Sequence, residues 1–315
     1  MRLAILDDYE EVALELTDWD SLGPEITIDV YHDNIKDEDA LVARLLPYDI
    51  LVIMRERTPF PRRLVEKLSN LKLLVTTGAR NLGIDLAACK EKGIVVCGTG
   101  SSGRAAAELA WALILATLRR IPQLDRSARA GRWGDGIGAG LHGKVLGVLG
   151  LGKLGTQVAR VGLAFGMKVI AWSQNLTPER AAQAGVHRAE KDELFAAADI
   201  ITIHLVLSDR TRGVVGAREL KLMKPTAYIV NTSRGPIIDE KALIAALSEG
   251  RIAGAGLDVF ETEPLPGDHP FLSLTNTVIT PHVGYVIREG FQTYFEHARE
   301  DVTAWLAGRP IRTLE

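Results

Sequence analysis

Cysteine is scarce in this sequence. The chain of 315 residues contains only Cys89 and Cys97. Two cysteines in this arrangement fit neither a disulfide framework nor a zinc site, so we expect no metal centre. Apolar residues surround both of them in the sequence, and we therefore expect two buried free thiols.

Long apolar runs are also missing. The longest, "AAAELAWALILATL" at residues 105–118, contains Glu108 and falls short of the roughly 20 residues that a membrane-spanning helix needs. We expect a buried helix there instead. The first residues, "MRLAILDDYE", contain too short an apolar stretch for a secretory signal. The sequence therefore predicts a soluble, cytoplasmic protein with no membrane partner.

Charge of one sign is not concentrated anywhere in the chain. No block of lysine and arginine is longer than two residues, and the formal net charge is −3. A nucleic acid is therefore not expected as a partner. Apolar residues make up 47% of the chain and charged residues 24%, which is the balance of an ordinary globular protein. At roughly 100–200 residues per domain, the length predicts two domains.

The sequence is rich in short apolar runs that alternate with helical patterns. Before residue 99 the runs lie at 2–6, 26–30, 49–54, 71–78 and 94–98, and after residue 143 at 145–150, 167–172, 199–205, 227–233, 253–259 and 277–282. Strands that alternate with helices indicate βαβ units and parallel sheets. A long helix is expected at about 104–120, where Pro122 and a glycine-rich stretch end the pattern. The segment from 288 to 308 is again helical. The prediction is an α/β fold with two parallel sheets.

A glycine pattern follows the predicted strand that begins at Val145. In "VLGVLGLGKLG", Gly150, Gly152 and Gly155 form G-x-G-x-x-G between a strand and a helix, with residues 153 and 154 (Lys153 and Leu154) inside the pattern. The first glycine permits a tight turn, the second lets a diphosphate approach the backbone, and the third lets helix and strand pack closely. In this context the pattern predicts a dinucleotide site.

The position expected to contact the ribose carries no carboxylate. After the strand at 167–172 come Ser173, Gln174 and Asn175, and the nearest arginine is Arg180. An acidic residue here would hold a ribose 2′-hydroxyl and repel a 2′-phosphate. Its absence favours tolerance of NADP(H), and NAD(H) stays open.

Five sequence blocks together resemble the D-isomer-specific 2-hydroxyacid dehydrogenases. They lie at 76–100, 145–159, 220–247, 254–266 and 280–285. The resemblance implies two Rossmann-like or flavodoxin-like domains, with the nucleotide domain inserted in a discontinuous substrate domain. The substrate domain would comprise 1–98 plus 286–315, and the NAD(P)-binding domain 99–285. It also implies a homodimer, in which we expect Trp133 to lie at the interface.

The resemblance assigns three catalytic residues. Arg234 in "NTSRG" matches the substrate arginine, Glu263 in "FETEP" the carboxylate partner, and His282 in "TPHVG" the acid/base histidine. A planar guanidinium can bind the carboxylate and carbonyl of a 2-keto acid together. Imidazolium is a suitable proton donor near neutral pH, and a buried carboxylate against the ring would favour that form and fix its tautomer.

The same resemblance implies further contacts to cofactor and substrate. Those to the dinucleotide, besides Arg234 and His282, are His204, Thr211, Thr232, Ser233, Asp258 and Gly284. For Asp258, a purely structural role in its own loop is an equal alternative. Those to the substrate, besides Arg234 and His282, are Gly78, Ala79, Arg80 and Tyr285. Arg80 could add a positive charge or face solvent, and Tyr285 could close the pocket or cap the core. Arg55 could line the cleft, although a surface position is favoured.

The resulting hypothesis is a reductase of a small 2-keto acid that uses NAD(H) or NADP(H) and yields the D-2-hydroxy acid. The alternatives are an enzyme similar to phosphoglycerate dehydrogenase, or a dinucleotide-sensing protein similar to a corepressor. Formate-type relatives are disfavoured, because they carry glutamine at the position of Glu263.

Overall fold

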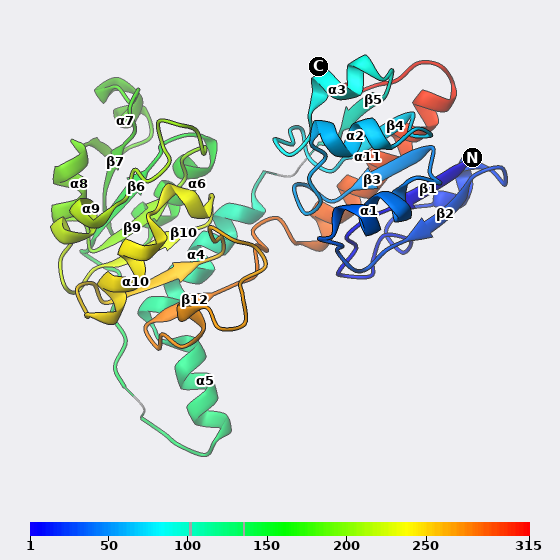
Figure 1. Ribbon diagram of the computed structural model, residues 1–315. Coiled ribbons are helices and arrows are strands. Elements are labelled where there is room, and N and C mark those ends of the chain that lie inside the picture. The colour runs from blue at the N-terminus through cyan, green and yellow to red at the C-terminus, as the bar shows by residue number, and fades with distance from the viewer. Residues whose placement is uncertain (101–102, 135) are drawn as a thin grey trace. The chain divides into compact units, whose positions relative to one another are not determined.

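The computed structural model describes residues 1–100, 103–134 and 136–315, and the chain divides into two compact units (Figure 1). Unit 1 comprises Met1–Ser102 and Val286–Glu315, and unit 2 comprises Gly103–Tyr285. Each unit is built on one parallel sheet covered by helices. The predicted α/β fold with two parallel sheets is therefore confirmed.

Unit 1 contains a five-stranded sheet in the order β2-β1-β3-β4-β5. This is the flavodoxin-like order, in which the chain reverses direction across the sheet next to β1. The strands are β1 (Arg2–Ile5), β2 (Thr27–Val30), β3 (Ile50–Ile53), β4 (Leu73–Thr76) and β5 (Val95–Gly98). The central strands β3 and β4 are buried at every position, which explains why their sequences are continuous apolar runs.

The helices of unit 1 cover both faces of that sheet. They are η1 (Trp19–Leu22), α1 (Glu38–Leu45), α2 (Arg62–Lys67), α3 (Leu86–Glu91) and α11 (Arg288–Leu306). Asp37 and Asp85 begin α1 and α3 by accepting hydrogen bonds from the backbone N–H of the third helical residue, the usual role of an N-cap aspartate. The C-terminal helix α11 packs on β4 and so belongs to unit 1.

Unit 2 contains a seven-stranded sheet in the order β12-β11-β10-β9-β6-β7-β8. The strands are β6 (Val145–Leu149), β7 (Lys168–Trp172), β8 (His187–Arg188), β9 (Ile200–Ile203), β10 (Tyr228–Asn231), β11 (Gly254–Leu257) and β12 (Thr277–Ile279). The strand β6 pairs with β7 on one side and β9 on the other. The strand order therefore reverses at β6, and open α/β sheets bind ligands outside the carboxyl ends of strands at such a point.

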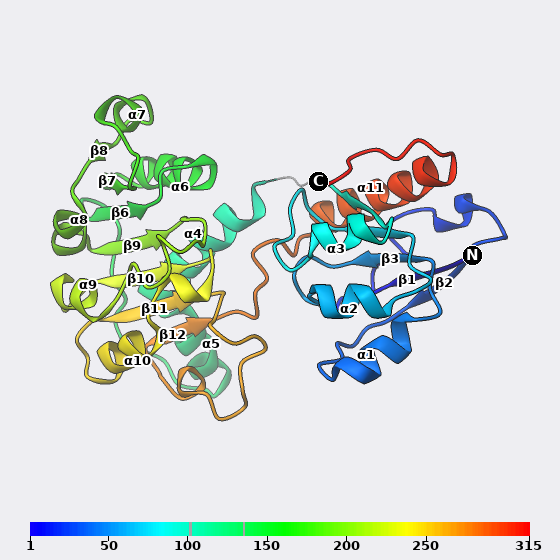
Figure 2. The same ribbon diagram turned by 45° about the horizontal axis from the view of Figure 1, so that its top comes forward.

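Helices cover both faces of the unit 2 sheet (Figure 2). A separate hydrophobic core lies between the sheet and the helices on each face. One face packs against α4 (Ala105–Leu118) and α6 (Lys153–Ala164), and the other against α8 (Lys191–Ala197), α9 (Ala217–Leu222) and α10 (Glu240–Ser248). The remaining elements are α5 (Ile121–Arg129), α7 (Pro178–Gln183), η2 (Gly235–Ile237) and η3 (Pro270–Leu272). The buried helix predicted at 105–118 is confirmed as α4.

The helical pattern does not end at Pro122 as predicted. Arg120 adopts a left-handed conformation (φ +55°), and the helix α5 then begins with Pro122 in its first turn, where proline is tolerated. The short strand β8 was also missed, because two exposed residues give no apolar signal. Cys89 and Cys97 are buried free thiols, as expected, and burial raises their pKa to about 11 and 12. Within the described residues, no helix combines the length and apolar character needed to traverse a bilayer.

Candidate active site

The residues predicted for unit 2 lie at the carboxyl ends of its strands. Because the strands are parallel, these ends share one edge of the sheet. The strand order puts the predicted catalytic residues after β10, β11 and β12, the glycine turn after β6, and the predicted ribose contacts after β7. Neighbouring strands lie about 4.8 Å apart, so this edge is long enough for an extended dinucleotide.

The glycine turn joins β6 to α6. Gly150 has φ +105°, and a Cβ placed there would lie 2.7 Å from the backbone of His204. A Cβ at Gly155 would lie 2.0 Å from the carbonyl oxygen of Gly150, so the first turn of α6 packs directly on the loop. At Gly152 a Cβ would meet nothing within 4 Å. The first and third glycines are thus required by packing, whereas the second leaves the backbone open to an approaching group.

The residues after β7 form a polar turn. The Leu176 N–H donates to the carbonyl of Ser173 at 2.9 Å, which folds the segment back toward α7. Ser173 is half-buried, while Gln174 and Asn175 are exposed. The turn therefore presents neutral hydrogen-bonding side chains at the position predicted to contact the ribose.

His204 and Thr211 are engaged in contacts within their own segment. The His204 N–H donates to the Leu149 carbonyl at 2.8 Å, and its ring Nε2 lies 2.9 Å from Thr202 Oγ1. Burial lowers the pKa of His204 to about 4, so the ring is neutral at physiological pH. The Thr211 hydroxyl donates to the Val206 carbonyl at 2.7 Å and thereby shapes the loop after β9.

The segment after β10 is held by an asparagine that sequence reasoning missed. Asn231 is buried, accepts the Ser233 N–H at 3.0 Å and donates to the Arg234 carbonyl at 3.0 Å. The Ser233 hydroxyl donates to the Ile203 carbonyl at 2.8 Å, which ties the turn to β9. Thr232 is half-buried in the same turn. An asparagine two residues before a serine at a strand end is typical of such a turn, and this signal could have identified Asn231.

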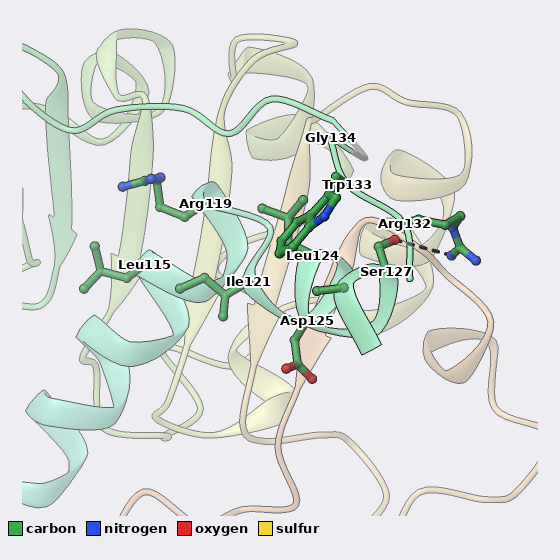
Figure 3. Close-up of a pocket in the computed structure, with 10 residues that line it drawn as sticks. Leu115, Arg119, Ile121, Leu124, Asp125, Ser127, Arg132, Trp133 and Gly134 are labelled. Carbon is green, nitrogen blue, oxygen red and sulfur yellow. Dashed lines mark hydrogen bonds between the residues drawn. The ribbon is translucent and has the colours of Figure 1, made fainter. Parts of the chain in front are cut away.

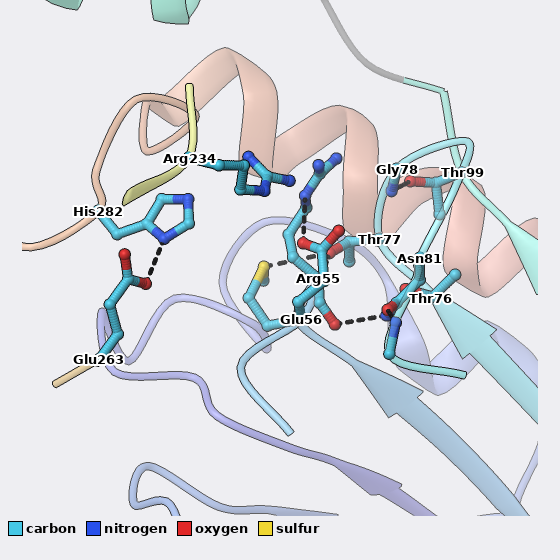
Figure 4. Close-up of polar contacts among 12 residues, drawn as sticks. Arg55, Glu56, Thr76, Thr77, Gly78, Asn81, Thr99, Arg234, Glu263 and His282 are labelled. Atoms are coloured by element: carbon cyan, nitrogen blue, oxygen red, sulfur yellow. Dashed lines mark hydrogen bonds and ion pairs between the residues drawn. The ribbon is translucent and has the colours of Figure 1, made fainter. Parts of the chain in front are cut away.

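His282 and Glu263 form a close pair (Figure 4). The His282 Nδ1 lies 2.6 Å from Glu263 Oε2, and the other carboxylate oxygen accepts the Phe260 N–H at 2.9 Å. His282 has φ +55°, an uncommon conformation for a residue with a side chain. With Nδ1 facing the carboxylate, the ring presents Nε2 away from Glu263.

Glu263 is less buried than expected. Its side chain is 34% exposed, because the loop from 261 to 269 lies at the surface of unit 2. Burial pushes the pKa of Glu263 upward, but the hydrogen bond with His282, its positive charge and the Phe260 N–H together bring the pKa below the usual value. The carboxylate is therefore charged at neutral pH and can accept a hydrogen bond from His282 Nδ1.

Asp258 follows β11 and organises the loop that carries His282. Its Oδ1 accepts the Thr280 hydroxyl at 2.6 Å and the Val283 N–H at 2.8 Å, and its Oδ2 accepts the Gly284 N–H at 2.9 Å. Burial raises the pKa of Asp258, although these three donors and His282 oppose the increase. If Asp258 has a structural role, that role is to hold the 280–284 loop in position through these three hydrogen bonds.

Tyr285 lies next to the histidine. The two rings meet edge to face, with centroids 6.0 Å apart and an interplanar angle of 76°. Tyr285 is half-buried, so its ring borders the imidazole of His282 instead of filling the core.

The loop after β4 in unit 1 contains Gly78, Ala79 and Arg80, the three residues of this unit that were predicted to contact the substrate. Gly78 has φ +93°, and its N–H already donates to the Thr99 hydroxyl at 2.7 Å, so this N–H is engaged within the unit. The predicted contact of Gly78 with a substrate stays a prediction, and in this structure its N–H is bound to Thr99. Ala79 and Arg80 are exposed.

Arg55 is not the surface residue that the sequence suggested. Its N–H donates to the Thr77 hydroxyl at 2.9 Å, its carbonyl accepts from Asn81 Nδ2 at 2.6 Å, and its side chain is only 23% exposed (Figure 4). A Cβ on Gly78 would lie 2.2 Å from Arg55 Nη1. The guanidinium therefore lies directly against Gly78. The polar residues Thr77 and Asn81 in "TTGARN" are the sequence signal that could have indicated hydrogen bonds to a neighbouring segment such as that of Arg55.

The helix α5 and the segment after it form an apolar hollow in unit 2 (Figure 3). Trp133 and Ile137 are 92% and 94% exposed. The residues that line the hollow are Leu115, Arg119, Ile121, Leu124, Asp125, Ser127, Ala128, Arg132, Trp133 and Gly134. A monomer rarely exposes large apolar side chains in such a group.

The strand order and the glycine turn define unit 2 as a dinucleotide-binding α/β domain. Residues 111–284 match the family model described as "D-isomer specific 2-hydroxyacid dehydrogenase, NAD binding domain". The chain therefore belongs to the D-isomer-specific 2-hydroxyacid dehydrogenase family, and the resemblance seen in its motifs is confirmed.

Relatives with different printed activities are similar to this chain. A glyoxylate reductase of Aeropyrum pernix is 42% identical over 72% of this chain and 70% of its own length. A D-3-phosphoglycerate dehydrogenase of Archaeoglobus fulgidus is 34% identical over 99% of this chain, which spans only 58% of that protein. A crystal structure of phosphoglycerate oxidoreductase from Vibrio cholerae is 38% identical with a TM-score of 0.92, covering 98% of this chain and 99% of the other.

Proposed function

We propose that the chain is an NAD(P)-dependent D-2-hydroxyacid dehydrogenase that reduces a small 2-keto acid to the D-2-hydroxy acid. The observation that carries this proposal is the 2.6 Å contact between His282 Nδ1 and Glu263 Oε2. It lies at the same sheet edge as Arg234 and the glycine turn. A proton donor, an anion-binding guanidinium and a dinucleotide cradle are the three parts that reduction of a keto acid requires.

The residues of unit 2 fit a nicotinamide dinucleotide. The open backbone at Gly152 and the N-terminus of α6 would hold the diphosphate. Ser173, Gln174 and Asn175 would face the ribose, and without a carboxylate they accommodate NAD(H) or NADP(H). When bound, the dinucleotide supplies the hydride for reduction.

The side chains of this chain supply binding and proton transfer. Arg234 offers a fork of N–H donors to the carboxylate and carbonyl of the keto acid and stabilises negative charge that develops on the carbonyl oxygen. His282 donates a proton from Nε2 to that oxygen, while Glu263 holds Nδ1 and fixes the orientation of the ring. In the reverse reaction, neutral His282 accepts the proton of the hydroxyl group. For the substrate carboxylate we also propose the Ala79 N–H, since that of Gly78 is engaged.

The substrate class can be identified by a turnover panel. The purified chain is assayed with glyoxylate, hydroxypyruvate and phenylpyruvate, each with NADH and NADPH, and in the reverse direction with D-glycerate and 3-phosphoglycerate. We expect reduction of at least one keto acid and loss of it in His282→Ala. Dinucleotide binding without any turnover would reject the dehydrogenase and favour the dinucleotide-sensing alternative.

We further propose that the chain forms a homodimer through the hollow at α5. Trp133 and Ile137 are almost fully exposed, and burying them against a second copy would remove apolar surface from water. Sedimentation velocity should give a dimer that Trp133→Ser with Ile137→Ser converts to a monomer. A monomeric parent chain would contradict the proposal. The cytoplasmic location stays a prediction from the sequence.

A further inference from the structure

The loop between β11 and η3 carries Glu263 but is itself largely exposed. A carboxylate on such a loop would sample many positions unless the loop is fastened. Both ends of the loop are anchored in the core, because Phe260 and Phe271 are 6% and 3% exposed and their rings lie 6.1 Å apart. Between them Leu265 packs against the same core, but the residues next to Glu263 are exposed, so a further constraint would help to keep Glu263 at 2.6 Å from His282.

Glu240, the first residue of α10, supplies such a constraint from outside the loop. Its Oε2 accepts the Glu261 N–H at 3.1 Å, and its Oε1 lies 3.1 Å from His269 Nε2. The Glu240 and His269 side chains are only 16% and 13% exposed. One carboxylate therefore joins the beginning of the loop to its end, and we name this arrangement the Glu240–His269 clasp.

The protonation of His269 follows from its two contacts. Its Nδ1 faces the Phe271 N–H at 3.3 Å and must act as an acceptor there. In the neutral ring the proton then resides on Nε2, which donates it to Glu240. The clasp is therefore a hydrogen bond from His269 Nε2 to the Glu240 carboxylate.

The clasp acts on the same backbone that holds the catalytic carboxylate. The Phe260 N–H donates to Glu263, and the next N–H, that of Glu261, donates to Glu240. The same segment presses on Gly235, where a Cβ would lie 2.0 Å from the Phe260 carbonyl carbon. Gly235 follows Arg234 in the chain. A displaced 260–261 backbone would therefore disturb both the carboxylate and the segment that carries the guanidinium.

We propose that Glu240 and His269 are positioning residues for the proton-transfer pair. They do not contact the substrate, but they fix the loop so that Glu263 reaches His282 Nδ1. This inference rests on the dehydrogenase function proposed above. Its consequence is that opening the clasp lowers kcat while the KM for the dinucleotide stays close to that of the parent protein.

Two substitutions of His269 separate positioning from folding. In His269→Asn the amide oxygen occupies the place of Nδ1 and still accepts the Phe271 N–H, but the donor to Glu240 is lost. In His269→Gln the amide nitrogen reaches the place of Nε2 and restores that donor. In Glu240→Gln one oxygen remains to accept, so one of the two contacts of the clasp is lost.

The test measures kcat, both KM values, the pH profile of kcat/KM and the melting temperature. We expect His269→Asn and Glu240→Gln to lower kcat roughly tenfold, with the dinucleotide KM within about twofold. The pH profile of kcat/KM should change in both variants, because a displaced Glu263 no longer contacts His282 Nδ1. His269→Gln should recover most of the activity. Hydrogen exchange of the 260–271 amides should rise in His269→Asn and stay low in His269→Gln.

The outcomes distinguish this inference from the proposed function. Normal kcat and unchanged exchange in folded His269→Asn and Glu240→Gln would overturn the clasp while leaving the dehydrogenase intact. Equal losses in His269→Gln and His269→Asn would also overturn it. If the parent chain reduces no keto acid, the function fails, and the exchange measurement still decides whether the clasp orders the loop. Should His269→Asn not fold, Glu240→Gln provides the same comparison.

Discussion

Two aspartates, one in each unit, are fully buried, and they are held in different ways. Asp258 of unit 2 and Asp301 of unit 1 both have 0% exposure. The two oxygens of Asp258 accept three hydrogen bonds in total. For Asp301, Oδ1 accepts from Arg312 Nε at 2.9 Å, whereas Oδ2 has no partner in the part of the chain that the structure describes. Burial raises the pKa of both, and that of Asp301 reaches about 7.

The difference shows how one residue type serves two purposes. All three donors to Asp258 lie on the loop that carries His282, so its charge arranges the proposed site. Asp301 lies on α11 and holds the C-terminal segment through Arg312, whose carbonyl accepts the N–H of Gly98, the last residue of β5. Unit 2 therefore uses a buried charge to orient a reactive side chain, and unit 1 uses one to secure the chain end. Each prediction below changes one side of this comparison.

The largest effect is expected from His282→Ala. Removing the proton donor should lower kcat by roughly 10³-fold, because general acid catalysis contributes about that much. Dinucleotide affinity, measured by fluorescence titration, should stay nearly unchanged. As a matched control, the exposed histidine His187 on β8 replaced by alanine should retain kcat within about twofold. Turnover equal to that of the parent in His282→Ala would reject the assigned role.

Asp258→Asn should have the next largest effect on activity. An amide presents one oxygen and one NH₂ group, so one of the backbone donors at Val283 or Gly284 would meet another donor. We expect kcat to fall about 100-fold as the loop that carries His282 shifts. The corresponding change in unit 1, Asp301→Asn, should leave kcat unaltered. Equal losses in both variants would erase the distinction between the two aspartates.

Asp301→Asn should instead change how stability depends on pH. The folded pKa of about 7 exceeds the ordinary value of 3.8, so between these values the folded state holds a proton that the unfolded state has lost. Stability therefore falls as pH rises through this window, and the cost is fully present above about pH 7. The variant lacks this titration and should gain roughly 4 kcal/mol relative to the parent between pH 4 and pH 8. Calorimetry across this range measures the difference, and parallel curves would contradict the assignment.

The sheets and the glycine turn could be predicted because local patterns determine them. Buried parallel strands such as β3 read as continuous apolar runs, and the glycines of the turn stand at fixed spacing. The pairing of His282 with Glu263 was predicted through the resemblance to a family, since residues 19 positions apart carry no local signal of contact. Its geometry in this structure agrees with that pairing, while the catalytic roles stay predictions.

The parts that could not be predicted depend on contacts between distant segments. A surface position was favoured for Arg55 over a place lining the cleft, but Thr77 and Asn81 hold it against Gly78. The Glu240–His269 clasp joins residues 29 positions apart, and neither residue stands out in its own segment. The helix α5 was missed because a proline was interpreted as a terminator, although it occupies a position in the first turn that proline tolerates.

The smallest predicted effect compares one glycine from each unit. Gly152 has open space around it and an extended φ, so Gly152→Ala should fold with an unchanged melting temperature. The added methyl group would stand where the diphosphate approaches, and we expect dinucleotide affinity to fall about tenfold, as measured by calorimetric titration. Gly78 has φ +93° and lies against the Arg55 guanidinium, so Gly78→Ala should lower the melting temperature instead. The opposite result, a lower melting temperature of Gly152→Ala with normal dinucleotide affinity, would contradict this prediction. Gly152 would then be needed for folding, as Gly78 is expected to be.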